Sequence, residues 1–238
     1  MNAREEHLAT RRAAGLFDFS FMGLYEFSGT EALDRLQTRR LADLEPGRTA
    51  YTLLLNDDGS VFNDATVWRL DADRFWLFTG RRRDFERFRG VARDRSGDYA
   101  VLALQGPSSG AILARLAGAE IILGLKYFHF TETHAMVIAR LGFSGELGYE
   151  LTVPAKDEPR LRQALLEAGR SDGLRECSFA AADSLRIESG YVLFDREIDG
   201  RANPRELGLE RLVSNPGLRF SLSKLLVGLE FVDRKSVV

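Results

Sequence analysis

Hydrophobic and polar positions alternate most clearly over residues 53–70, LLLNDDGSVFNDATVWRL. Two apolar runs rich in β-branched and aromatic residues flank the polar cluster at 56–60, which predicts two strands joined by a hairpin turn. In the second run Phe62, Asp64 and Trp68 share one face, because alternate residues of a strand point the same way. Asp64 is therefore expected beside large aromatic side chains.

A carboxylate among aromatic rings has two interpretations. Asp is unfavourable inside strands, and near apolar groups it costs free energy unless it is paired or hydrated. Asp64 could therefore lie on an edge strand and face water, which is the usual place for such a residue. Alternatively, it lies in an aromatic-lined cleft that binds a heterocyclic ligand. The pattern of this segment alone leaves both interpretations open.

The rest of the pattern predicts strands and helices in clusters rather than in strict alternation. Residues 16–27 form a strand-like run with Phe17, Phe19 and Phe21 on one face. Further strands are expected at 74–79, 99–104, 125–130, 135–141 and 149–153, and helices at 3–14, 30–41, 81–91, 107–116, 157–168 and 177–188. A last strand-like run at 225–232 cannot bury itself alone. The arrangement is typical of an α+β fold with antiparallel sheets and packed helices.

Composition excludes several classes of protein. The 238 residues are 45% hydrophobic and 29% charged with a net charge of −2, which is ordinary for a globular protein and argues against a nucleic-acid partner. Cys177 is the only cysteine, so no internal disulfide can form, and a reducing, cytoplasmic environment is expected. No apolar run approaches the roughly 20 residues of a membrane span. The charged N-terminus also lacks the apolar core of a secretory signal.

Motifs for several other chemistries are missing from the sequence. Among the three histidines, His129 and His134 are five positions apart, which places them on opposite faces of an extended segment. No Cys/His set has metal-ligand spacing, so we expect no metal site. No glycine-rich phosphate loop opens a helix, and no GxSxG motif supports a serine hydrolase.

The segment of residues 140–151, RLGFSGELGYEL, carries a second acidic candidate. Gly142, Gly145 and Gly148 give this loop the backbone freedom to approach a ligand. Glu150 follows at the start of a strand, where its carboxylate could accept a forked pair of hydrogen bonds from an aminopyrimidine ring. An exposed glutamate after a hairpin loop is the alternative, and this segment alone does not exclude it.

Several motifs follow one another in a fixed order. They are GLFDFSFMG at 15–23, NDDGSVFND at 56–64, LQGP at 104–107, GFSGELGYE at 142–150, and DSLRIESGY at 183–191 with Asn203-Pro204 after it. This succession resembles the glycine-cleavage T-protein superfamily of tetrahydrofolate-dependent aminomethyltransferases over residues 5–230. That superfamily also holds folate domains of dimethylglycine- and sarcosine-oxidising enzymes and folate-dependent demethylases.

The resemblance implies tetrahydrofolate as the cofactor and Asp64 as the catalytic residue. Asp64 matches the family's aspartate beside the bridging nitrogens of the folate, where a carboxylate stabilises the cationic carbon being transferred. Glu150 matches the glutamate that anchors the pterin through its 2-amino and N3–H groups. The other cofactor-binding positions are apolar or aromatic walls of the folate cavity. They fall on Met22, Tyr51, Trp68, Phe78 and Tyr191.

Four positions depart from the family's motifs. Phe21 replaces a histidine, and Asn63 replaces the first acid of an acidic pair. Gly80 replaces an asparagine, and Ala182 replaces an arginine, which would remove a cation from the pocket side. The resemblance also implies that a segment before the first helix is absent, and that the C-terminal barrel domain is missing beyond its first strand.

The implied architecture is a pair of interleaved folate-binding subdomains. Residues 1–23 and 100–212 would form the enclosing subdomain, residues 24–99 the inserted one, and residues 213–238 a remnant of the barrel. The implied function is tetrahydrofolate-dependent transfer of an aminomethyl group, with a lipoylated carrier protein or an oxidase subunit as partner. A non-catalytic folate-binding or regulatory module and a folate-dependent demethylase are the alternatives. No nucleic-acid or membrane partner is expected.

Overall fold

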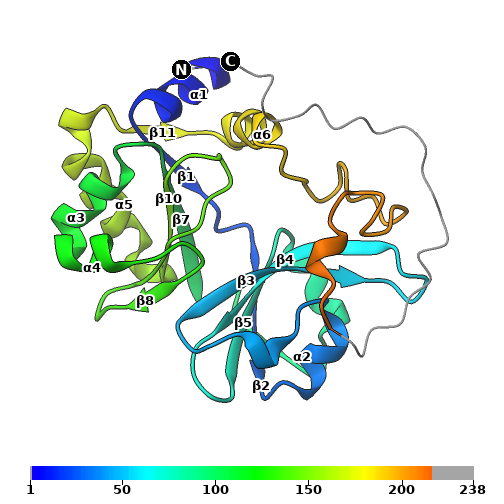
Figure 1. The fold of residues 1–238 in the computed structure, drawn as a ribbon. Helices are drawn as coiled ribbons and strands as arrows, with labels where there is room; N and C mark the ends of the chain where they lie inside the picture. The colour runs from blue at the N-terminus through cyan, green and yellow to red at the C-terminus, as the bar shows by residue number, and fades with distance from the viewer. Residues whose placement is uncertain (1, 216–238) are drawn as a thin grey trace.

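Two β-sheets organise the chain in a computed structural model that describes residues 2–215 (Figure 1). Within this range the first sheet has six strands in the order β11–β1–β7–β10–β9–β8, and the second has five in the order β3–β4–β5–β2–β6. The first sheet contains β1 (Gly15–Asp18), β7 (Tyr99–Gln105), β8 (Phe130–Glu132), β9 (Val137–Ala139), β10 (Gly148–Pro154) and β11 (Arg175–Cys177). The second contains β2 (Gly23–Ser28), β3 (Arg48–Leu55), β4 (Val61–Arg69), β5 (Arg74–Thr79) and β6 (Arg93–Asp94).

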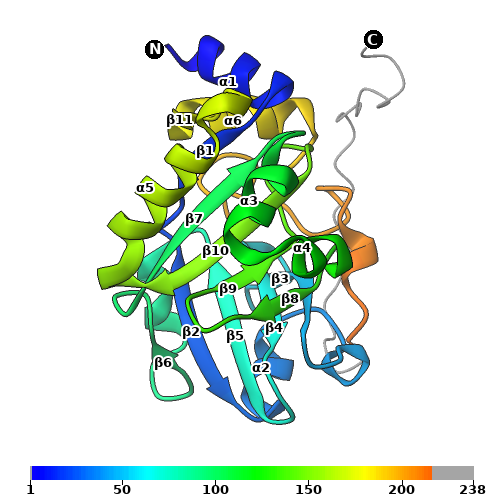
Figure 2. The ribbon, with the colours of Figure 1, turned by 90° about the vertical axis from the view of Figure 1, so that its left-hand side faces the viewer.

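Helices cover one face and one end of the six-stranded sheet. The helices α3, α4 and α5 lie over that sheet (Figure 2), whereas α1 and α6 pack together at one end of the molecule (Figure 1). The helices are α1 (Ala3–Arg12), α2 (Glu31–Leu36), α3 (Ser109–Ala117), α4 (Ala119–Gly124), α5 (Glu158–Ala168) and α6 (Phe179–Glu188). Short 3-10 helices occur at Leu41–Asp43, Arg82–Arg87, Ala155–Asp157, Arg170–Asp172 and Glu210–Leu212. The predicted α+β class with antiparallel sheets and packed helices is confirmed.

Strand β7 shows why the core forms on both faces of the first sheet. Leu102 and Leu104 point toward the helices, in one apolar cluster with residues of α3 and α5. Val101 and Ala103 point the other way, into an aromatic cluster that joins the two sheets. Because both faces of the strand are covered, its sequence is apolar throughout rather than alternating.

The prediction of a single strand at residues 16–27 is wrong. In the middle of this segment the chain passes from the first sheet to the second. β1 ends at Asp18, whose carboxylate accepts a hydrogen bond from the backbone N–H of Ser20 (2.9 Å). A turn follows, in which the N–H of Met22 donates a hydrogen bond to the carbonyl of Phe19 (3.0 Å). The chain then enters β2 of the second sheet. A residue pattern of period two cannot distinguish one long strand from two strands joined by a short crossing.

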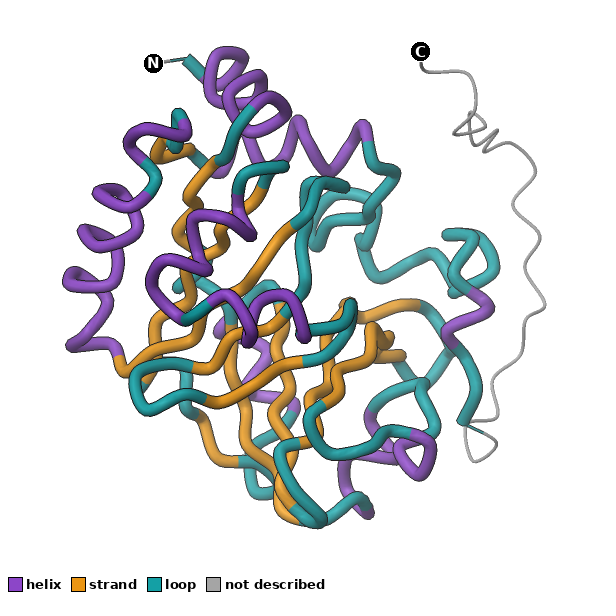
Figure 3. The backbone as a smooth tube through the Cα atoms, turned by 60° about the vertical axis from the view of Figure 1, so that its left-hand side comes forward, coloured by secondary structure: helices purple, strands orange, loops and turns teal. Residues whose placement is uncertain are grey.

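The segment after α6 returns to the second sheet. Residues 189–209 are mostly loop (Figure 3), and their apolar side chains Val192, Ile198 and Leu207 pack on the hairpin of β3 and β4. The strands of the second sheet all fall between residues 23 and 94 in the described part of the chain. The subdomain boundaries remain a proposal. The strand-like run at 225–232 and most of the proposed 213–238 unit lie outside the described residues.

Candidate functional site

A cavity lies between the two sheets, where β4, β5 and β10 approach the segment after α6. It contains about 960 Å³ of empty space, its open mouth included. Its walls are mainly apolar and aromatic. Asp64 and Glu150, which are far apart in the sequence, both line this cavity, as the sequence predicts.

Asp64 lies on an interior strand, because β4 is hydrogen-bonded to β3 and β5. The interpretation of Asp64 as an edge-strand residue is therefore wrong. The hydroxyl of Tyr51 donates a hydrogen bond to its Oδ2 (2.8 Å). Burial raises the pKa of Asp64 to about 6, against the opposing effects of the Tyr51 hydrogen bond and the charge of Arg81. The carboxylate is mainly ionised at pH 7 but lies close to the range where it takes up a proton.

The neighbouring Asn63 points away from the cavity and is fully buried. Its Nδ2 donates to Oδ2 of Asp84 (2.5 Å), and the Nε of Arg81 donates to Oδ1 of the same carboxylate (3.0 Å). An acid at position 63 would place two buried carboxylates against each other, which is unfavourable. Local packing therefore favours an amide at position 63 over the acid of the family's motif.

Glu150 lies on an interior strand of the first sheet. Its strand β10 lies between β7 and β9, and its cross-strand neighbours are Ala103 and Ala139, whose small side chains leave room beside it. Among residues 2–215 the Glu150 carboxylate has no hydrogen-bond or ion-pair partner, and burial raises its pKa to about 7. Buried polar groups normally have partners. An unpaired carboxylate at a cavity wall fits a ligand that brings its own donors.

The predicted wall residues Met22, Tyr51, Phe78 and Tyr191 all line the cavity. Trp68 does not, and its expected place in the wall is wrong. Its ring is fully buried, its Nε1 donates to Oγ1 of Thr66 (2.9 Å), and it packs on Phe78 with ring centroids 4.8 Å apart. Trp68 therefore supports the wall from behind.

The sequence pattern does not assign the other lining residues to the site, because most come from turns and irregular segments without periodicity, and a few lie in β4, β5 or α6 without a signal of their own. They are Phe19, Ala65, Thr66, Thr79, Tyr127, Phe128, Leu141, Phe143, Phe179, Val192, Leu193 and Phe194. Phe143 is the exception, because it lies within the glycine-rich motif and a signal for it was available. Its ring stacks on that of Tyr191, with centroids 6.0 Å apart and planes inclined by 15°.

Backbone strain is concentrated at this cavity. In the described part of the chain, two non-glycine residues have positive φ, Phe128 and Asp195, each at 58°. Phe128 lines the cavity, and Asp195 follows Phe194, which also lines it. Asp195 is held in place by Arg81 and Arg83 (2.9 Å and 2.8 Å). Such conformations persist where the surroundings impose them, and they are frequent at functional sites.

The other three positions that depart from the motifs of the similar family each have well-defined surroundings. Phe21 lies at the cavity, where its ring meets Phe179 edge to face with centroids 5.2 Å apart. A Cβ added at Gly80 would be 2.0 Å from Cδ1 of Phe194, so an asparagine does not fit beside this phenylalanine. Ala182 is buried in the aromatic cluster and does not line the cavity, which differs from its expected place on the pocket side.

Two further properties concern residues 2–215 as a whole. None of their helices combines the length and the apolar character needed to cross a membrane. No group of three or more His, Cys, Asp and Glu side chains is placed to hold a metal ion in that range.

The cavity is characterised by two acids with raised pKa values and by aromatic walls. Those features define a class, proteins with an aromatic-walled ligand cavity that holds two buried acids.

Within that class, the chain belongs to the family described as the GCVT N-terminal domain, whose model matches residues 1–216. It is 38% identical to an aminomethyltransferase of Chlorobaculum tepidum over 98% of this chain and 69% of the relative. It is 37% identical to an aminomethyltransferase of Symbiobacterium thermophilum, over 97% of this chain and 71% of the relative. The crystal structure of the glycine cleavage system aminomethyltransferase T from Bartonella henselae matches with a TM-score of 0.77 and 30% identity, over 89% of this chain and 61% of that one.

Proposed function

We propose that this chain binds tetrahydrofolate in the cavity between its sheets and takes part in folate-dependent aminomethyl transfer. The observation that carries the proposal is the unpaired Glu150 carboxylate in the same cavity as the Tyr51-bound Asp64. The named activity of the similar proteins supports the proposal.

The residues present fit a reduced folate. Glu150 would accept hydrogen bonds from the 2-amino and N3–H groups of the pterin, whose paired donors match the two oxygens of a carboxylate. The aromatic walls, among them Phe78 and Tyr191, would stack on its flat ring. This binding would give Glu150 the partners that residues 2–215 do not supply.

Asp64 would carry out the chemical role. Tetrahydrofolate, when bound, supplies the nitrogens that accept the one-carbon unit. The Asp64 carboxylate, fixed by Tyr51, would hold a negative charge where positive charge develops during transfer. Its pKa of about 6 would also allow it to hold a proton released during the reaction.

The partner would be a lipoylated carrier protein that delivers the aminomethyl group. Phe21 and Phe179, each 39% exposed, line the cavity and offer an apolar entrance. Such an entrance suits the hydrocarbon arm of a lipoyl group and would exclude water from the cavity. An oxidase subunit is the alternative partner.

Calorimetric titration of the purified chain with 5-formyltetrahydrofolate tests the binding, and an assay with an aminomethyl-loaded lipoyl carrier tests the transfer. We expect saturable binding with one site per chain and release of ammonia in the presence of tetrahydrofolate. A chain that binds no reduced folate would refute the proposal. Binding of the folate without transfer from the lipoyl carrier would favour the non-catalytic folate-binding module.

A further inference from the structure

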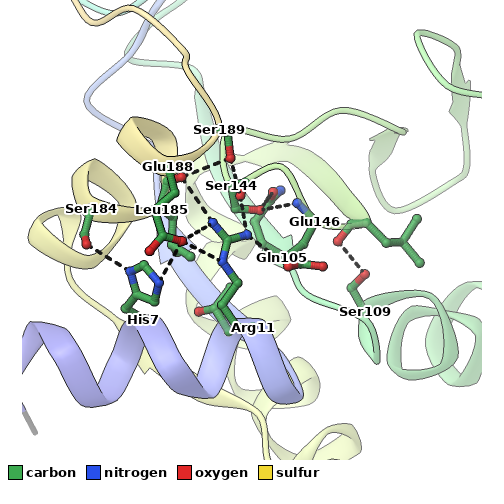
Figure 4. Close-up of polar contacts among 12 residues, drawn as sticks. His7, Arg11, Gln105, Ser109, Ser144, Glu146, Ser184, Leu185, Glu188 and Ser189 are labelled. Carbon is green, nitrogen blue, oxygen red and sulfur yellow. Dashed lines mark hydrogen bonds and ion pairs between the residues drawn. The ribbon is translucent and has the colours of Figure 1, made fainter. Parts of the chain in front are cut away.

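The loop of residues 142–148 is held in place from two sides by side chains that lie outside the cavity (Figure 4). On one side Gln105, buried at the end of β7, accepts a hydrogen bond from Oγ of Ser144 (2.8 Å). On the other side Nη1 of Arg11 and Oγ of Ser189 both donate to the carbonyl of Ser144 (2.6 Å and 2.8 Å). Ser144 is therefore fixed through both its side chain and its backbone.

The glycines of the loop leave room for these side chains. A Cβ added at Gly142 or Gly148 would lie 2.4 Å from the side-chain amide of Gln105. At Gly145, whose φ is +78°, a Cβ would lie 2.2 Å from Oγ of Ser189. Gly142 lines the cavity, and all three glycines line a second hollow that shares Tyr127 and Tyr191 with it, so their close approach to a ligand stays a prediction.

Arg11 is the centre of this arrangement, and its side chain is only 23% exposed. Besides Ser144, its guanidinium binds Oε1 of Glu146 in the loop (2.9 Å) and Oε2 of Glu188 in α6 (2.9 Å). It also donates to the carbonyl of Leu185 in α6 (3.3 Å). One guanidinium of α1 therefore ties the loop to α6, through charge-assisted bonds with fixed directions.

Both elements that Arg11 joins lead directly into the cavity. The loop contributes Gly142 and Phe143 to the cavity wall and enters β10 two residues before Glu150. Tyr191, on which Phe143 stacks, comes shortly after the end of α6. A change in the distance between the loop and α6 would therefore separate the Phe143–Tyr191 stack and shift the strand that presents Glu150.

We propose that Arg11 is a positioning residue for the ligand cavity. It fixes the loop of residues 142–148 against α6, so that Phe143 and Glu150 are already aligned before a ligand binds. Pre-alignment of this kind lowers the entropic cost of binding. The inference rests on the proposed function, because the ligand it concerns is the reduced folate.

The test compares two arginines that each join several elements. Arg11→Met removes the contacts described above. Arg162→Met is the matched control, because Arg162 is 27% exposed and binds Asp18, Glu158 and Glu176, none of which lines the cavity. Three quantities are measured for each variant: the melting temperature, the Kd for 5-formyltetrahydrofolate, and the amide hydrogen exchange of the ligand-free chain.

We expect both variants to melt at a lower temperature, because each loses partly buried ion pairs. Arg11→Met should raise the Kd roughly tenfold or more, whereas Arg162→Met should change it by no more than about twofold. Faster hydrogen exchange at residues 141–150 should appear in Arg11→Met alone. If Arg11→Met does not fold, Ser189→Ala removes one donor to the Ser144 carbonyl without breaking an ion pair, and it should raise the Kd about threefold.

Two results would overturn the inference and leave the proposed function standing. One is that the wild-type chain and the Arg11→Met variant bind the folate with the same Kd. The other is an equal loss of affinity in Arg11→Met and Arg162→Met. A wild-type chain that binds no reduced folate would overturn the proposed function together with the inference.

Discussion

Replacing Glu150 by Gln should stabilise the ligand-free chain and weaken folate binding. The Glu150 carboxylate has no partner among residues 2–215, and burial raises its pKa from the usual 4.5 to about 7. Because the folded-state pKa exceeds the unfolded one, folding favours the protonated acid, and its contribution to stability is full below about pH 4.5 and is lost as the pH rises through about 7. At pH 8 the folded chain contains an ionised, unpaired carboxylate. A neutral amide of the same shape removes this penalty.

The size of the effect follows from the two pKa values. The gap between 4.5 and about 7 corresponds to about 3 kcal/mol of unfolding free energy. The carboxylate is partly exposed, so screening by solvent reduces the expected gain to about 1–2 kcal/mol at pH 8. That gain raises the melting temperature by about 2–8 °C. Folate binding should weaken by about 1–3 kcal/mol, because an amide cannot accept the same pair of charge-assisted hydrogen bonds.

Thermal unfolding followed by circular dichroism at pH 4, 6 and 8 measures the first effect, and calorimetric titration with 5-formyltetrahydrofolate at pH 8 measures the second. The gain in melting temperature should be present at pH 8 and absent at pH 4. Glu132→Gln, at an exposed position of β8, is the control and should change neither quantity. A Glu150→Gln chain that melts below wild type at pH 8, or binds the folate equally well, would refute the reasoning.

Three other substitutions test the acid on β4 and its neighbours. Asp64→Asn should leave reduced-folate binding within about threefold but abolish aminomethyl transfer, because the amide cannot stabilise developing positive charge; equal turnover would show that Asp64 is not the reacting carboxylate. Tyr51→Phe removes the donor to Asp64, so the pKa of that acid should rise above about 6, and the acid limb of the pH–rate profile should move to higher pH; an unmoved profile would contradict this. Asn63→Asp places a second carboxylate against Asp84 and should lower the free energy of unfolding in urea by about 1–3 kcal/mol at pH 7, and by less in acid; an unchanged free energy would argue against the contact.

The hairpin shows how far the sequence predicts this fold. Alternation and the turn residues predict its two strands, and the structure has β3 and β4 joined by a turn in which the N–H of Asn56 donates to the carbonyl of Ser60 (2.9 Å). Alternation also predicts the face of β4 on which Asp64 lies. It does not predict that β4 is an interior strand, because that depends on β5, which pairs with it through a separate turn.

The sequence pattern predicts the ends of helices and strands less well where tertiary contacts decide them. The helix expected at 30–41 ends at Leu36, because Gln37 bridges to Leu54 of β3. The helix expected at 81–91 is a 3-10 segment, Arg82–Arg87. The run at 125–130 yields a strand only from Phe130, because the preceding chain turns at Phe128 with positive φ. At Gln37 a partner distant in the sequence, and at Phe128 a strained turn, overrides the local pattern.

The two acids of the cavity differ in their surroundings, and under the proposed function this difference predicts different roles for them and one orientation of the ligand. Asp64 has a hydrogen-bond donor in Tyr51 and a nearby positive charge in Arg81, which fix this carboxylate and offset part of the rise in its pKa caused by burial. Glu150 has no such support among residues 2–215, so the free-energy cost of its buried charge would be relieved by donors from a ligand. A preformed charge suits chemistry, whereas an unsatisfied acceptor suits recognition. The donor-rich end of the ligand should therefore lie against β10, and its reacting end against β4.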